Sequence, residues 1–207
     1  MTQKVDGRRE RGDATRRKAA RYAADLATVG GLETVTVGRL ASGTSLSKSG
    51  ILTVFGNREA IQLAAVAEAR RVYVDHVIRP AWRREPGLSR LRGIIDHWFG
   101  YVTDRVFPGG CFLLATATEY AAREGPVADA VRALKREWLE LLESELRVAL
   151  PDTAAGRRRA AEAAFEIDAL LSAAHLRYRL LQDDDGLAFG RRAVNRLLRS
   201  LPPGRAA

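Results

Sequence analysis

Residues 36–56 read TVGRLASGTSLSKSGILTVFG, and this stretch decides how the fold is interpreted. Thr36 and Ser47 are residue types that favour the N-cap of a helix, because their hydroxyl oxygens accept a hydrogen bond from a first-turn amide. Gly43 and Gly56 stand where each helix would then end. The stretch therefore predicts two short helices and a tight connection between them: residues 36–43, 47–56 and 44–46.

The second of these helices has the pattern of a helix that reads DNA. In a helix-turn-helix the second helix lies in the major groove, so it is short, polar at its N-terminus and held from behind by apolar residues. Lys48 and Ser49 begin it with polar side chains. Ile51 and Phe55 lie four residues apart, so both can pack on Leu40 of the preceding helix. We therefore expect a helix-turn-helix.

Three consecutive motifs carry a resemblance to a known family. Residues 36–41 read TVGRLA, residues 45–52 read SLSKSGIL and residues 55–61 read FGNREAI. With their spacing, they resemble the DNA-binding head of the TetR family of transcriptional regulators, over residues 14–65. The resemblance implies that the basic side chain of Arg58 contacts phosphate. It also implies a head core formed by the apolar positions Val37, Leu40, Ala41, Leu46, Ile51 and Phe55.

Three positions depart from the usual pattern of that family. Leu52 stands where the family usually has a phosphate-contacting tyrosine, and Val54 stands where it often has histidine. Ser45 replaces the glycine that usually makes the turn. Because leucine lacks the tyrosine hydroxyl, we expect weaker DNA binding or a larger share of binding by the basic N-terminal segment.

The charge of the chain favours a polyanionic partner, either nucleic acid or an anionic membrane surface. The 34 Lys and Arg outnumber the 25 Asp and Glu, which gives a net charge of +9. Residues 1–59 hold eleven basic and six acidic residues, a net charge of +5. Residues 1–12 are polar and basic without an apolar period, so we expect a flexible basic arm there.

Contacts with DNA are expected at the starts of three helices and along the basic N-terminal segment. Backbone amides at Thr36, Ser47 and Asn57 favour phosphate, because the helix dipole lies behind them. Arg39 and Arg58 supply charge beside these amides. The DNA-binding residues that we expect are Arg16, Arg17, Thr36, Val37, Arg39, Ser47, Lys48, Ser49, Gly50, Thr53, Asn57 and Arg58.

The rest of the chain predicts an all-α fold. Helical periodicity dominates from Ala14 onward, and the alternating pattern of half-buried strands is scarce. With Asp13 as the cap of the first helix, we expect about nine helices: residues 13–27, 36–43, 47–56, 57–77, 88–105, 111–123, 126–150, 154–182 and 187–201. The expected domains are a flexible basic arm (1–12), a helix-turn-helix DNA-binding domain (13–59) and a ligand-binding and dimerisation domain (60–207).

The resemblance implies that residues 60–207 bind a small molecule and form a homodimer through the last two long helices. Small residues in 154–182 and leucines in 187–201 allow such pairing, although packing within one chain is the alternative. Aromatic and polar residues on apolar helices are candidates for a cavity wall, although single residues of this kind are more often ordinary core. The ligand-binding candidates are Trp98, Phe99, Val102, Phe112, Thr116, Glu119, Tyr120, Trp138 and His175.

Motifs of catalysis, of cofactor binding and of metal binding are missing from the sequence. The three histidines lack the H-E-x-x-H spacing, and there is no G-x-G-x-x-G, Walker or G-x-S-x-G motif. The single cysteine, Cys111, cannot form an internal disulfide, which indicates a reducing compartment. The N-terminus has no apolar signal region and no apolar run reaches the roughly 18 residues of a membrane span, so we expect a cytoplasmic protein that does not enter a membrane.

These features predict a sequence-specific DNA-binding transcriptional regulator. Its mode of action is expected to be that of a homodimeric repressor, which leaves a palindromic operator when a small molecule binds. The alternative is an all-helical small-molecule-binding or interaction protein whose DNA binding is weakened or lost, and it is motivated by Leu52 and Val54.

Overall fold

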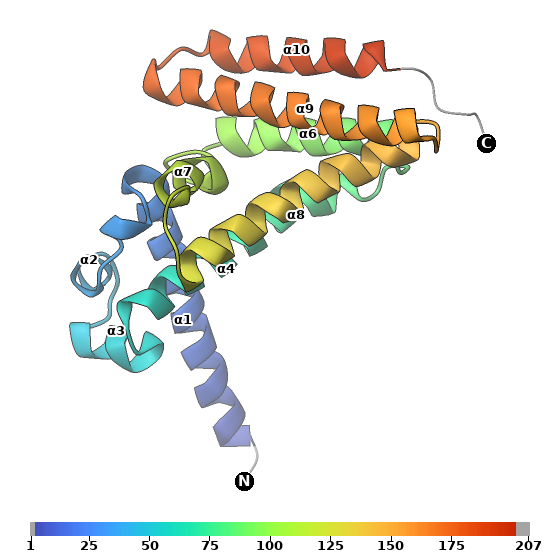
Figure 1. The fold of residues 1–207 in the computed structure, drawn as a ribbon. Helices are drawn as coiled ribbons and strands as arrows, with labels where there is room; N and C mark the ends of the chain where they lie inside the picture. Colours follow the sequence, from blue (N-terminus) through green and yellow to red (C-terminus); the bar gives the residue numbers. More distant parts are fainter. Residues whose placement is uncertain (1–2, 202–207) are drawn as a thin grey trace. The chain divides into compact units, whose positions relative to one another are not determined.

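A computed structural model of the protein describes the backbone of residues 3–201 and the side chains of residues 12–201 (Figure 1). Every regular element in this range is helical, so the all-α prediction is confirmed. The elements are α1 (Gln3–Gly30), η1 (Leu32–Thr34), α2 (Val37–Gly43), α3 (Lys48–Phe55), α4 (Arg58–Tyr73), η2 (Val74–Ile78), α5 (Arg79–Ala81), α6 (Leu88–Thr103), α7 (Phe112–Tyr120), α8 (Pro126–Ala149), α9 (Ala154–Leu180) and α10 (Asp185–Ser200).

The first helix begins ten residues earlier than the sequence pattern predicted. Residues 3–12, expected as a flexible arm, are part of α1, and Asp13, expected as its cap, lies inside the helix. This segment is rich in Arg, Lys, Glu and Gln, which are good helix formers, and extending an existing helix is far cheaper than nucleating one. The first two residues of the predicted arm lie outside the described residues.

The helix that begins at Arg58 changes its winding before it ends. The sequence predicted an end near Val77, whereas helical backbone continues through the π-helical η2 and ends with α5 at Ala81. Pro80 has no N–H group and cannot donate to a carbonyl of the preceding turn. The π-helical turn, in which the hydrogen-bond pattern of the helix changes, lies directly before this proline-containing turn.

The chain divides into two compact units. The first unit comprises the residues up to Val72 together with Phe107–Arg132, and the second comprises Tyr73–Val106 together with the residues from Ala133 onward. This division differs from the boundary expected after residue 59, because residues 107–132 return to the N-terminal helices and pack on α1. The division of labour between a DNA-binding head and a ligand-binding body stays a prediction.

The first unit has a core of small and branched side chains. Of the predicted head core, Leu40, Ile51 and Phe55 are buried, while the other three positions are half-buried. Small side chains on one face of α1 let the neighbouring elements approach closely. The buried alanines of this face are Ala19, Ala20, Ala23, Ala24 and Ala27.

The second unit is dominated by a pair of long helices. Figure 1 shows α9 and α10 side by side, and these two elements pack on each other along much of their length. Gly190 of α10 lies against Ala174 of α9, where a larger residue would not fit. Ala174 therefore serves close packing within this chain, while pairing of α9 and α10 with a second copy stays a prediction.

Candidate nucleic-acid interface

The starts of α2, α3 and α4 are capped by the three residues that the sequence predicted. The Thr36 hydroxyl accepts from the Arg39 amide at 3.2 Å, and the Ser47 hydroxyl accepts from the Gly50 amide at 3.1 Å. The side-chain oxygen of Asn57 accepts from the Ala60 amide at 2.8 Å. Each cap satisfies an amide that the helix itself leaves unbonded, so the three helices begin at defined residues.

Helix α3 turns an apolar face inward and a mixed face outward. Ile51 is fully buried and Phe55 nearly so. The outward face is formed by the exposed residues Lys48, Ser49, Leu52 and Thr53. Leu52, at the position of the family's usual tyrosine, also belongs to this outward face.

The hydroxyl groups on the outward face of α3 are bonded within the helix. The hydroxyl oxygens of Ser47 and Ser49 lie 3.0 Å apart in a hydrogen bond. The Thr53 hydroxyl donates to the carbonyl oxygen of Ser49 at 2.9 Å.

Neither Lys48 nor Arg17 makes a hydrogen bond or ion pair with a residue that the structure describes, and both are exposed. They are therefore available cations beside α3 and on α1.

Arg58, expected as a phosphate anchor, is bonded to the segment between α1 and α2. Its Nε donates to the Val35 carbonyl at 3.2 Å, and its Nη2 donates to the Glu33 carbonyl and, at 2.9 Å, to the Glu33 carboxylate. A planar guanidinium suits such a fork of acceptors. The side chain thus ties the start of α4 to η1, and the sequence reasoning missed Glu33 as its partner.

Arg16 and Arg39 are also engaged within the first unit. Arg16 donates to the Val54 carbonyl at 2.6 Å, and its guanidinium lies 4.8 Å from the centre of the Phe55 ring. Arg39 donates to the Thr34 carbonyl at 3.4 Å. Arg16 therefore holds the C-terminal end of α3 against α1, a positioning role that spacing along the sequence does not reveal.

Glu119 and Tyr120, expected as ligand-binding residues, contact η1. The Glu119 carboxylate accepts from the amides of Leu32 at 2.7 Å and Glu33 at 2.9 Å. The Tyr120 hydroxyl donates to the Glu33 carboxylate at 3.0 Å, and Arg123 forms an ion pair with the same carboxylate at 2.9 Å. We call these residues, with Arg58, the η1 cluster.

The η1 cluster shifts the titration of two of its members. Burial raises the pKa of Glu33, but the hydrogen bond from Tyr120 and the charges of Arg58 and Arg123 outweigh it, so this pKa lies below its ordinary value of 4.5. Burial, the hydrogen bond to Glu33 and the carboxylates of Glu33 and Glu119 raise the pKa of Tyr120 to about 12. Near neutral pH the carboxylate is ionised and the phenol is protonated, which is the state that the hydrogen bond needs.

The nine ligand-binding candidates divide between the two units. Phe112, Thr116, Glu119 and Tyr120 belong to the first unit, and all but Glu119 are buried. The Thr116 hydroxyl donates to the Phe112 carbonyl of its own helix at 2.9 Å. In the first unit, therefore, the three polar candidates already have partners in the chain.

The candidates in the second unit are all buried. They are Trp98, Phe99, Val102, Trp138 and His175. Trp98 and Phe99 meet edge to face with ring centres 5.0 Å apart. The Trp138 indole donates to the Asp168 carboxylate at 3.0 Å, and Lys135 donates to both oxygens of that carboxylate at 2.6 Å. Their role as a cavity wall stays a prediction.

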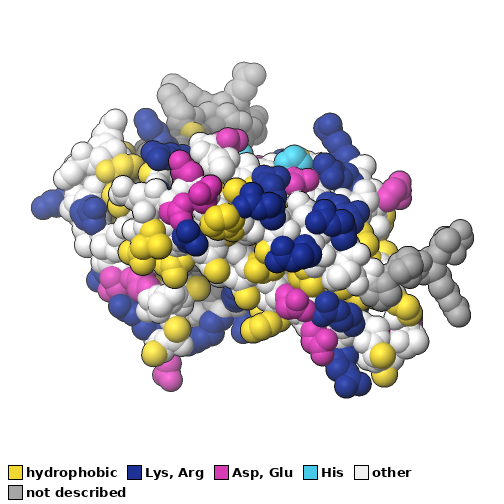
Figure 2. Space-filling view, turned by 90° about the horizontal axis from the view of Figure 1, so that it is seen from above, with side chains coloured by type: hydrophobic (Ala, Val, Ile, Leu, Met, Phe, Trp, Pro, Cys, Tyr) yellow, Lys and Arg dark blue, Asp and Glu magenta, His cyan; other side chains and the backbone are white. Residues whose placement is uncertain are grey.

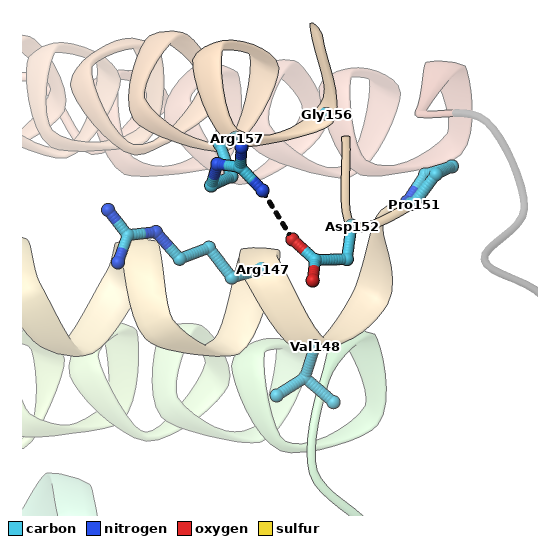
Figure 3. A pocket seen from close by; sticks show the side chains of 6 residues that line it. All are labelled: Arg147, Val148, Pro151, Asp152, Gly156 and Arg157. Carbon is cyan, nitrogen blue, oxygen red and sulfur yellow. Dashed lines mark hydrogen bonds and ion pairs between the residues drawn. The ribbon is translucent and has the colours of Figure 1, made fainter. Parts of the chain in front are cut away.

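A hollow of about 420 Å³ lies at the turn from α8 to α9, within the second unit (Figure 3). None of the ligand-binding candidates lines it. Figure 3 shows Arg157 facing Asp152, with which it forms an ion pair at 2.6 Å. Arg147, on the same hollow, is paired with Glu143. Both cations are neutralised by neighbouring carboxylates, so the hollow has little attraction for an anion. Its lining residues are Arg147, Val148, Pro151, Asp152, Gly156 and Arg157.

One face of α9 exposes large apolar side chains. Phe165 is 72% exposed, Leu176 61% and Leu180 70%. With Ala169 and Ala173 they follow helical spacing and form a single apolar stripe. Figure 2 shows hydrophobic side chains lying between Lys and Arg side chains on the face seen from above. An exposed apolar stripe of this kind favours contact with another protein surface.

The described residues hold no cluster of three or more His, Cys, Asp or Glu side chains that could bind a metal ion. Within the same residues, no helix combines the length and the apolar composition that crossing a membrane requires. Cys111 is buried.

An all-α chain with a capped helix-turn-helix near its N-terminus has the fold of a helix-turn-helix transcriptional regulator. The family model described as the Tetracyclin repressor-like C-terminal domain matches residues 87–194, more than half of the 207 residues. The chain belongs to the TetR family. Members of this family are transcriptional regulators and not enzymes.

Several solved structures share this fold. A TetR transcriptional regulator from Chloroflexus aurantiacus is 22% identical, with a TM-score of 0.78 over 92% of this chain and 95% of that chain. A putative transcriptional regulator from Saccharomonospora viridis, in complex with choline, is 17% identical, with a TM-score of 0.73 over 91% and 97%. AibR, in complex with isovaleryl coenzyme A and operator DNA, is 18% identical, with a TM-score of 0.66 over 91% and 99%. The search of curated proteins finds no match.

Proposed function

We propose that the protein is a sequence-specific DNA-binding regulator that acts as a homodimeric repressor and is released from its operator by a small molecule. The observation that carries this proposal is the outward face of α3. This helix is capped by Ser47, held from behind by Ile51 and Phe55, and exposes Lys48 at its N-terminus. That arrangement fits a helix in the major groove. Because its target is DNA, we expect the protein in the compartment that holds the genome, the cytoplasm.

DNA binding is tested by selecting a site from a random pool of duplexes with the full chain. We expect enrichment of a palindrome whose half-sites lie about one helical turn apart. The selected site should bind at least about 10³-fold more tightly than random duplex at the same salt concentration. Lys48→Ala should weaken binding to the selected site while leaving the fold intact. Equal affinity for selected and random DNA would contradict sequence-specific binding.

Dimerisation is supported by the apolar stripe on α9. A helix that exposes Phe165, Leu176 and Leu180 gains free energy by burying them, at about 25 cal/mol for each Å² of apolar surface. A second copy of the same helix offers a complementary apolar surface under twofold symmetry. Two such copies would present two α3 helices to a palindrome.

Response to a small molecule is supported by the η1 cluster in the first unit. Glu119 and Tyr120 on α7 are bonded to the segment that precedes α2. A ligand that moves α7 would therefore disturb the helix-turn-helix through these bonds. Among structures of the same fold, one contains choline and another contains isovaleryl coenzyme A. Screening effectors by loss of operator binding tests this part of the proposal.

A second candidate function is a ligand-binding or interaction protein with weakened DNA binding. Two observations favour it: Arg58 is bonded to Glu33 and Val35, and Leu52 offers no hydrogen bond to phosphate. The selection experiment separates the two functions, because a protein of this second kind would enrich no site while still forming dimers and binding its effector.

A further inference from the structure

Leu52 exposes an apolar side chain on the outward face of α3. Its side chain is 44% exposed, on an eight-residue helix whose other large apolar side chains are buried or half-buried. It stands beside Thr53 and one turn after Ser49, on the outward face. The exposed part of the Leu52 side chain lies on the face that the proposed function places in the groove, so it is accessible for contact with DNA.

The neighbouring polar groups offer few hydrogen bonds to a partner. The Ser49 hydroxyl is hydrogen-bonded to that of Ser47, and the Thr53 hydroxyl donates to the Ser49 carbonyl oxygen. With its hydroxyl turned to the helix, Thr53 contributes a methyl group to the outward face. The face therefore carries the ammonium group of Lys48, the Ser49 hydroxyl, which is bonded to Ser47, and an apolar surface formed by Leu52 and the Thr53 methyl group.

A surface of this kind matches one base edge in the major groove. Thymine presents a 5-methyl group there, and apolar side chains distinguish it from the other bases by contact. Lys48 precedes Leu52 by four residues, about 6 Å along the helix. That rise corresponds to roughly two base pairs at 3.4 Å each. Guanine, whose O6 and N7 accept from lysine, is the matching partner for the ammonium group.

We propose that Leu52 is a specificity-determining residue that reads the 5-methyl groups of thymines in the DNA site. The proposal rests on the proposed function, since it names part of the sequence that α3 recognises. Each half-site should then contain at least one essential thymine within about two base pairs of the base that Lys48 contacts.

The experiment replaces thymine by deoxyuridine, which keeps the base pair and removes only the methyl group. A site is first selected from a random pool with the full chain. Each thymine is then replaced singly, and the Kd is measured at one salt concentration. Burial of one methyl group corresponds to about a fourfold change in Kd, so we expect that loss at the thymines under Leu52.

Variants of the protein assign the effect to Leu52. Leu52→Ala should bind thymine and deoxyuridine sites equally, whereas Leu52→Met should retain the discrimination because it keeps an apolar end. Val29→Ala is the matched control, since Val29 is 67% exposed at the end of α1 and lies outside α3. The control should discriminate as the parent chain does.

The outcomes distinguish this proposal from the proposed function. If no site is enriched, DNA recognition fails and the role of Leu52 fails with it. If a site is enriched but no deoxyuridine substitution weakens binding, only the role of Leu52 is overturned. The role of Leu52 alone is likewise overturned if Leu52→Ala keeps the full discrimination between thymine and deoxyuridine.

Discussion

Glu119 on α7 accepts a hydrogen bond of 2.7 Å from the backbone amide of Leu32, which lies 87 residues earlier in the chain. The second oxygen of the same carboxylate accepts from the next amide, that of Glu33. The side chain therefore caps η1 from a distant helix, as an N-cap residue would from the adjacent position. This bond joins the turn before α2 to α7 within the first unit.

Replacing Glu119 by alanine should destabilise the protein. Two backbone amides would lose their acceptor, and we expect the free energy of unfolding to fall by about 1–3 kcal/mol. Urea unfolding followed by circular dichroism measures the change. Glu124→Ala is the control, because Glu124 is exposed and has no hydrogen bond to the residues that the structure describes. Equal stability of the two variants would show that the cap contributes nothing.

The raised pKa of Tyr120 predicts a dependence of stability on alkaline pH. In the folded state this pKa is about 12, against an ordinary value of 10.0. A group whose folded pKa is raised stabilises the fold below its unfolded pKa, and this contribution is lost as pH rises toward the folded pKa. The free energy of unfolding should therefore decrease between about pH 10 and 12, and less steeply in Tyr120→Phe. Tyr178→Phe is the control, and a parallel decrease in all three proteins would refute the assignment.

Arg16 and Arg17 are neighbours in the sequence, and their substitutions should have different effects. Arg16→Ala removes the bond to Val54 and the contact with Phe55, so the free energy of unfolding should fall by about 0.5–1 kcal/mol. Arg17→Ala should leave stability within about 0.5 kcal/mol. If Arg17 contacts one phosphate, its loss should reduce the slope of log affinity against log salt by about 0.9. Identical unfolding and identical salt slopes would contradict this separation of roles.

Gly109 marks a close approach of the chain to α1. Its amide donates to the Thr28 hydroxyl at 3.0 Å, and a Cβ at this position would overlap the Thr28 carbonyl oxygen. Gly109→Ala should therefore destabilise the protein by about 1–3 kcal/mol, because backbone must move. Gly100→Ala is the contrast, since a Cβ there meets only Asp104 at 3.9 Å and alanine favours a helix interior by about 0.5–1 kcal/mol. Thermal unfolding should shift in opposite directions for the two variants.

The apolar stripe on α9 predicts that a charge placed there will dissociate the proposed dimer. Leu176→Glu would place a carboxylate within the proposed interface, and the dimer Kd should rise by about tenfold or more. Sedimentation velocity over a range of concentrations measures it. Val148→Glu is the control, because Val148 is 63% exposed at the end of α8. A monomeric parent chain, or a Leu176→Glu variant that dimerises normally, would refute the interface.

Local signals in the sequence were sufficient for much of the first unit. The caps at Thr36, Ser47 and Asn57 act on amides three residues away, so composition and spacing determine them. The burial of Ile51 and Phe55 follows from the helical period in the same way. Predictions of this kind succeed because the interacting residues lie within about one helical turn of each other.

Contacts between distant residues were not accessible from the sequence. The residues next to Arg58 in the sequence do not indicate that its guanidinium binds Glu33, because the two residues lie far apart in the chain and meet only in the folded protein. The sequence assigned Glu119 to a ligand, and only the return of residues 107–132 to α1 places its carboxylate on η1. The start of α1 at Gln3 depends on propagation from the stable part of the helix, which apolar periodicity does not detect.

The return of residues 107–132 to α1 bears on attempts to exchange modules between regulators of this family. A chimera cut after residue 59 would bring the helix-turn-helix without Gly109, Glu119 and Tyr120, whose partners on α1 and η1 it would leave exposed. Grafting the segment 107–123 along with residues 1–72 would carry those partners across. For a protein engineer, the transferable part of this regulator is discontinuous in the gene, and the shorter segment would lack the bonds that join α7 to the turn before α2.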